Sequence, residues 1–98
     1  VFSVSEFTKT VFQMYDEQRA MVELLCANEM MKVIIDRFGE DVHTEITDDE
    51  HFTVTTEVSL SPNFYGWLFG FGDKIKVTGP QWVVDRYREM LHSELEQL

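Results

Sequence analysis

Residues 61–80 read SPNFYGWLFGFGDKIKVTGP, and this stretch predicts the aromatic helix around which the fold is built. Ser61 suits the N-cap of a helix, and Pro62 suits the first helical position, where the missing N–H of proline costs nothing. Gly72 can end the helix in a left-handed backbone conformation. The sequence therefore predicts a helix that begins at Pro62 and ends before Gly72.

The predicted helix is apolar on two sides. One side carries residues at i, i+3, i+4 and i+7, a spacing that predicts a stripe facing the core. The members of this stripe are Phe64, Trp67, Leu68 and Phe71. Tyr65 and Phe69 lie one turn apart and point elsewhere. We therefore take Tyr65 and Phe69 as candidates for self-association or for contact with another domain, with ordinary packing as the alternative.

The flanking sequence predicts four strands and further helices. Alternating apolar residues predict strands over 20–27, 42–46, 52–58 and 74–78. Stripes at helical spacing predict helices over 4–15, 28–38 and 80–98. In the first of these helices the stripe consists of Phe7, Val11, Met14 and Tyr15. In the second, Asn28 is expected to cap the helix and Met31 to face the core.

From residue 20 the predicted order is strand, helix, strand, strand, helix, strand, and then one extra helix. This order is typical of an α+β protein of the ferredoxin-like βαββαβ type, with a four-stranded antiparallel sheet and helices on one face. In the usual strand order the first strand lies between the third and the last. The open face then carries a small apolar patch at Met21 and Leu25, which makes these two residues the second pair of candidate contact residues.

Composition restricts the functions that this chain can have. The formal net charge is -10 and the sequence pI is about 4.5, so the chain alone should repel the phosphates of nucleic acids. The single cysteine, Cys26, cannot form an internal disulfide, which suits a reducing compartment. No apolar run approaches 18 residues. We therefore expect a cytoplasmic protein with no membrane partner.

No constellation of residues predicts catalysis, a metal ion or a cofactor. Cys26 lies at a strand end without an adjacent base and is expected to pack as a small apolar residue. His43 and His51 flank the predicted hairpin turn and could approach one another, with Asp48 or Asp49 nearby. Two histidines without an organised third ligand do not predict a metal site. We therefore predict that the chain has no catalytic, metal-binding or cofactor-binding residues.

Several motifs together resemble a known family. They are Asp36-Arg37-Phe38-Gly39, the strand Phe52-x-Val54, the aromatic helix with its following Lys74-Ile75, and Gly79-Pro80 with the helix after it. Over roughly residues 19–98 these motifs resemble the C-terminal extension, often called WCX, of WYL-domain transcriptional regulators. Residues 1–18 are similar to the connecting helix that leaves the WYL domain. The resemblance implies that residues 19–98 are the extension domain.

The resemblance also implies what the intact protein is. It implies a bacterial, cytoplasmic regulator with an N-terminal winged helix-turn-helix that binds DNA and a WYL domain that senses a nucleic-acid or nucleotide-like ligand. The extension is implied to dimerise and to relay the ligand state. The chain begins at Val1, and we expect it to be part of a longer protein.

Two functional hypotheses follow. The first is a non-catalytic regulatory and dimerisation module that couples ligand sensing to DNA binding. Its partners would be a second copy or the WYL domain, with DNA contacted only through the helix-turn-helix of the intact protein. The alternative is a small-molecule-binding regulatory domain of ferredoxin-like fold, which needs a polar pocket between helix and sheet or at a dimer interface.

Overall fold

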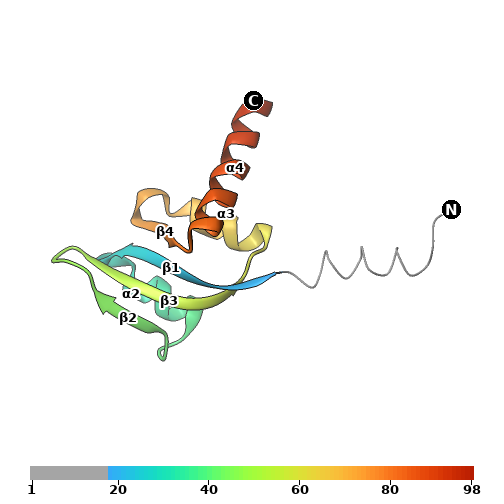
Figure 1. Ribbon diagram of the computed structural model, residues 1–98. Coiled ribbons are helices and arrows are strands. Elements are labelled where there is room, and N and C mark those ends of the chain that lie inside the picture. The colour runs from blue at the N-terminus through green and yellow to red at the C-terminus, as the bar shows by residue number, and fades with distance from the viewer. Residues whose placement is uncertain (1–17) are drawn as a thin grey trace, which may run out of the picture.

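The computed structural model describes residues 18–98, which form an α+β arrangement of a four-stranded antiparallel sheet and three helices (Figure 1). The elements are β1 (Arg19–Ala27), α2 (Met31–Phe38), β2 (His43–Ile46), β3 (His51–Ser59), α3 (Pro62–Gly70), β4 (Ile75–Gly79) and α4 (Gln81–Gln97). Short 3-10 turns precede α2 and β4, at Asn28–Met30 and Gly72–Lys74. The helix predicted over 4–15 lies outside the described residues.

The sheet has the strand order β2-β3-β1-β4. Strand β1 pairs with β3 along its whole length, from Arg19 opposite Ser59 to Ala27 opposite His51. Its other edge pairs with β4. Strand β1 therefore lies between β3 and β4.

The core lies on one side of this sheet, because successive residues of a strand point to opposite faces. Val22, Leu24 and Cys26 on the inner side of β1 are almost completely buried. The other main members of the same buried cluster are Phe52, Val54, Val58, Ile75, Ile34, Phe64 and Leu68. Helices α2 and α3 thus contribute to one core together with three of the four strands.

Helix α3 forms as the sequence predicts. The Phe64 N–H donates to Ser61 Oγ at 3.1 Å, so Ser61 caps the helix. Gly72 follows the helix with a φ of 60°, which favours glycine. Trp67 contacts Phe38 edge to face, with ring centroids 5.6 Å apart, and therefore joins α3 to α2.

The start of α2 differs from the prediction. Asn28 Nδ2 donates to the carbonyl oxygen of Asp49 at 2.9 Å, and the Asn28 N–H donates to the carbonyl oxygen of Glu50 at 2.9 Å. The side chain is therefore bound to the β2–β3 turn and does not cap α2, which begins at Met31. Met31 is exposed, and Val33 packs against the core instead.

Strand β4 also begins later than predicted. The alternation suggested a strand from residue 74, but Lys74 closes the 3-10 turn and β4 begins at Ile75. Lys74 Nζ lies 3.5 Å from Glu29 Oε1, so the lysine side chain points toward the 3-10 turn between β1 and α2. Gly72, at positive φ, begins this tight turn. The alternation of apolar and polar residues in the sequence could not indicate where the turn ends and the strand begins.

The central strand allows a matched test of the core. Leu24→Ala should lower the free energy of unfolding by about 2–5 kcal/mol, because Leu24 has no exposed surface and its removal leaves a cavity. Met21→Ala, on the outer face of the same strand, should change it by about 0.5 kcal/mol or less, since Met21 is 56% exposed. Urea unfolding measures both, and equal losses would contradict the assignment of the two faces.

Candidate functional site

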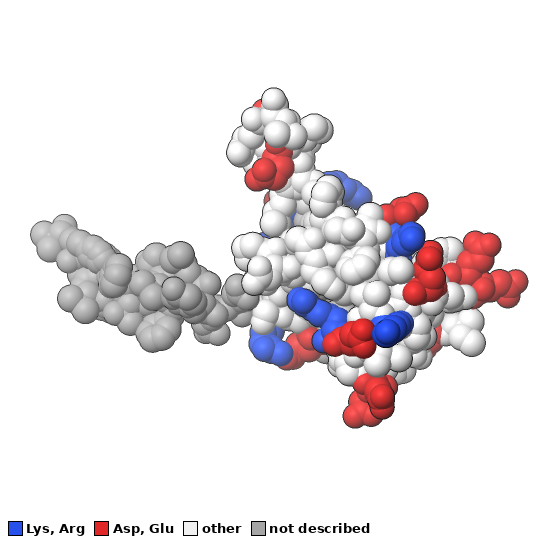
Figure 2. Space-filling view, turned by 180° about the vertical axis from the view of Figure 1, so that it is seen from behind, with Lys and Arg blue, Asp and Glu red and all other residues white. Residues whose placement is uncertain are grey.

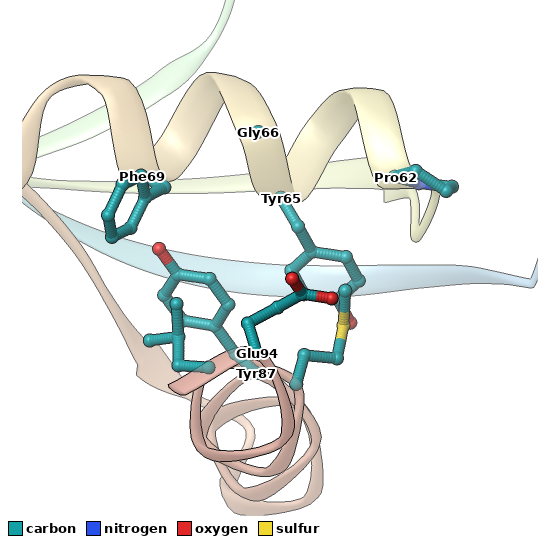
Figure 3. A pocket seen from close by; sticks show the side chains of 8 residues that line it. Pro62, Tyr65, Gly66, Phe69, Tyr87 and Glu94 are labelled. Atoms are coloured by element: carbon teal, nitrogen blue, oxygen red, sulfur yellow. The ribbon is translucent and has the colours of Figure 1, made fainter. Parts of the chain in front are cut away.

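A concave, largely apolar groove lies between α3 and α4. It has a volume of about 370 Å³ and opens to solvent (Figure 3). Its lining residues are Pro62, Tyr65, Gly66, Phe69, Tyr87, Met90, Leu91 and Glu94. Glu94 is the only charged residue among them. The groove is therefore suited to an apolar partner.

The groove follows from the contact between the two helices. Tyr65 of α3 stacks on Tyr87 of α4, with ring centroids 5.5 Å apart and an interplanar angle of 16°. Val83, in the first turns of α4, is fully buried and anchors this end of the helix. The second half of α4 then extends away from the body of the molecule (Figure 1). The diverging helices leave the groove between them.

The structure separates the two candidate residues of α3. Phe69 is 64% exposed at the edge of the groove and stays a candidate contact residue. Tyr65 is only 4% exposed, because Tyr87 covers its ring. Of the two alternatives that the sequence left open for Tyr65, contact with a partner and ordinary packing, its burial favours packing beneath the groove.

The Tyr65 hydroxyl is nevertheless unusual. It is buried and has no hydrogen-bond partner within residues 18–98. Burial raises the pKa of Tyr65, and the positive charge of Arg86 opposes part of that rise. A buried hydroxyl without a partner costs about 1–3 kcal/mol.

The apolar side of α4 continues beyond the groove. Leu91, Leu95 and Leu98 follow one another at i, i+4 and i+7, and all three are exposed. Leu95 is 67% exposed although it belongs to this stripe. Contiguous exposed apolar surface of this kind marks contact sites in soluble proteins. Phe69 and the stripe on α4 together form one such surface.

The second candidate surface lies on the open face of the sheet. Met21 is exposed and Leu25 is half-buried on that face. An ion pair between Arg19 Nε and Glu57 Oε1, 2.7 Å long, borders the Met21 side. The apolar area is thus small and interrupted by polar groups. Figure 2 shows that acidic side chains gather at the end formed by the β2–β3 turn.

The two histidines of the hairpin do not come together. His43 lies opposite Thr55 in the β2–β3 pairing, whereas the His51 imidazole binds Asp48 in the turn, with 2.9 Å between Nδ1 and Oδ1. The Glu50 N–H, which donates to Asp48, and His51 lower the pKa of Asp48 below its usual value. Across residues 18–98 no three His, Cys, Asp or Glu side chains are grouped to hold a metal ion.

The comparisons with known proteins identify one family. The family model described as WCX domain matches residues 18–93. No curated protein matches the chain. Of the helices in residues 18–98, none combines the length and the apolarity that crossing a membrane requires.

The only cysteine tests whether the core contains a reactive nucleophile. Burial raises the pKa of the Cys26 thiol to about 12, so very little thiolate is present at pH 8. We expect no reaction with Ellman's reagent in the native protein and one equivalent after denaturation. A Thr44→Cys variant, with an exposed thiol on β2, should react at once. Rapid reaction of native Cys26 would contradict its inert packing role.

Proposed function

The chain belongs to the WCX domain family, and we propose that it is the non-catalytic regulatory domain of a WYL-domain transcriptional regulator. The WCX family consists of regulatory domains and is not a known enzyme family. In this proposal the domain couples ligand sensing to DNA binding, and the intact cytoplasmic regulator contacts DNA through a separate helix-turn-helix. The strand order β2-β3-β1-β4 supports our assignment of the sheet to the ferredoxin-like βαββαβ type.

One observation carries this proposal: the apolar surface formed by Phe69 and the exposed side of α4. A domain without catalytic groups transmits a signal by contacts whose free energy differs between two states of the protein. An exposed aromatic side chain beside an apolar groove provides such a contact, because covering it removes apolar surface from water. We therefore assign this surface to docking against the remainder of the regulator.

The patch at Met21 and Leu25 is the second proposed contact. It lies on the open face of the sheet and is centred on one strand, so it can meet its own copy across a twofold axis. We assign the homodimer contact of the intact regulator to this patch. The net charge of -10 opposes association of the isolated chain, and the contact should therefore strengthen with added salt.

The groove gives less support to small-molecule binding. Its volume lies within the range of ligand pockets, which begins at about 300 Å³. A metabolite site, however, needs convergent polar groups that orient the ligand. Besides the Glu94 carboxylate, the groove is lined by the ring and hydroxyl of Tyr87, the Tyr65 hydroxyl is buried, and none of the lining residues is basic. Docking of a protein segment fits this lining better.

A reporter assay with the full-length regulator tests the docking assignment. Phe69→Glu should weaken the coupling between sensing and DNA binding and change regulation by about tenfold, within the usual range of coupling free energies. Ile46→Glu is the matched control, because Ile46 is 90% exposed on β2, outside the groove. Steady-state protein levels are compared in parallel to exclude unfolding.

The outcome separates the two surfaces. Normal regulation by the Phe69→Glu variant, at a normal protein level, would contradict the role of the groove.

Light scattering of the same full-length regulator with Met21→Glu tests the second surface. We expect Met21→Glu to lower the mass toward that of one chain, and an unchanged mass would contradict the homodimer contact at the sheet patch.

A further inference from the structure

We propose that the groove between α3 and α4 is the docking site of residues 4–15 of the same chain, the segment that precedes β1. This inference rests on the proposed function, because it names the partner of the surface assigned to docking. It is carried by the place where the described chain begins, by the sequence of the segment and by the charges at the entrance of the groove.

The chain enters the described structure beside the groove. The Leu60 N–H donates to the carbonyl oxygen of Gln18 at 2.7 Å, and Arg86 Nη1 donates to Gln18 Oε1 at 3.1 Å. Leu60 lies two residues before Pro62, which lines the groove, and Arg86 lies one turn before Met90 of the opposite wall. Gln18 is thus held at the end of the groove where α3 begins. Any segment that precedes Gln18 starts from that point.

The preceding sequence has the pattern that such a groove requires. At 3.6 residues per turn five of its six apolar residues fall on one side of the predicted helix: Val4, Phe7, Val11, Met14 and Tyr15. The sixth, Phe12, lies outside this side. The opposite side is polar and carries Glu6, Lys9, Gln13 and Asp16. Twelve helical residues span about 18 Å, which is sufficient to follow the nine residues of α3, about 14 Å. The segment is long enough and sufficiently amphipathic to cover the groove.

The charges at the entrance favour this path. Asp16 and Glu17 directly precede Gln18 in the sequence, and the Arg86 guanidinium donates to Gln18. Attraction between these two carboxylates and the guanidinium would favour the approach of the segment to α4.

The same chain is a better source of the segment than a second copy. A tether of a few residues gives an effective concentration on the order of millimolar. A second copy must instead bring together two chains that each carry a net charge of -10. Docking of the chain's own segment therefore dominates at ordinary protein concentrations.

This docking would give the groove a mechanical role. Whatever precedes residue 4 in the regulator would be attached to a helix seated between α3 and α4, and its orientation on this domain would be fixed. Release of the segment would free that orientation. The groove and the segment then form the two-state element that coupling requires.

Paramagnetic relaxation enhancement on the 98-residue chain tests the proposal. A nitroxide is attached at Ser93→Cys, an exposed position next to Met90 and Glu94 on α4. Buried Cys26 stays unmodified. We expect the amide signals of residues 4–15 to lose at least half of their intensity. The same label at Thr44→Cys, on the strand at the opposite edge of the sheet, should leave those signals unchanged.

Two further substitutions, made in the nitroxide-labelled Ser93→Cys protein, separate docking from mere proximity. Val11→Glu places a charge on the apolar side of the segment and should restore the intensity of the amide signals of residues 4–15. Gln13→Glu adds the same charge on the polar side and should leave those signals broadened. Phe69→Glu should restore them from the side of the groove. Unbroadened signals in the parent Ser93→Cys protein, or equal effects of Val11→Glu and Gln13→Glu, would overturn the proposal.

A mixed sample identifies the source of the segment. Isotope-labelled chains without a nitroxide are mixed with unlabelled chains that carry it. Broadening in this mixture as strong as in the singly labelled chain would place the segment of a second copy in the groove and overturn the assignment to the same chain. If residues 4–15 do not dock but Phe69→Glu still impairs the full-length regulator, the proposed function stands and only the identity of the partner is wrong.

Discussion

Helix α3 has to bury two of its sides, and this constraint determines both the fold and the groove. Phe64 and Leu68 face the core shared with the sheet, whereas Tyr65 points toward α4. A nine-residue helix with five aromatic and aliphatic side chains cannot hide all of them against a single layer. Tyr87 covers Tyr65 and thereby positions α4, and Phe69 is left uncovered at the edge. The exposed surface is thus a consequence of how the buried contacts are made.

Much of this architecture could be predicted from local sequence. Period-two alternation gives the strands and the face of each residue, as for Leu24 and Met21 on β1. The Ser61 cap and Gly72 give the limits of α3 because their signals are local.

What the sequence did not predict depends on distant partners. Partner contact and ordinary packing could not be distinguished for Tyr65, because the residue that covers it, Tyr87, lies far along the chain and on a different helix. Asn28 looked like a cap because the competing carbonyl of Asp49 becomes available only after the hairpin has folded back. The groove depends on the angle at which α4 leaves the body, and no local pattern determines that angle.

The acidic charge and the apolar groove have separate consequences. A net charge of -10 opposes approach to the phosphates of nucleic acids. The groove leaves apolar surface in contact with water, and covering that surface is favourable. Hydroxyl-radical footprinting of the intact regulator shows most directly whether the groove is covered. Phe69 and Met90 line the groove, and Trp82 lies outside it. The docking proposal predicts that the oxidation rates of Phe69 and Met90, each divided by the rate of Trp82, are far lower than the exposed fractions of these side chains in residues 18–98 would give. Oxidation in proportion to that exposure would show that the groove is open to solvent and would contradict it.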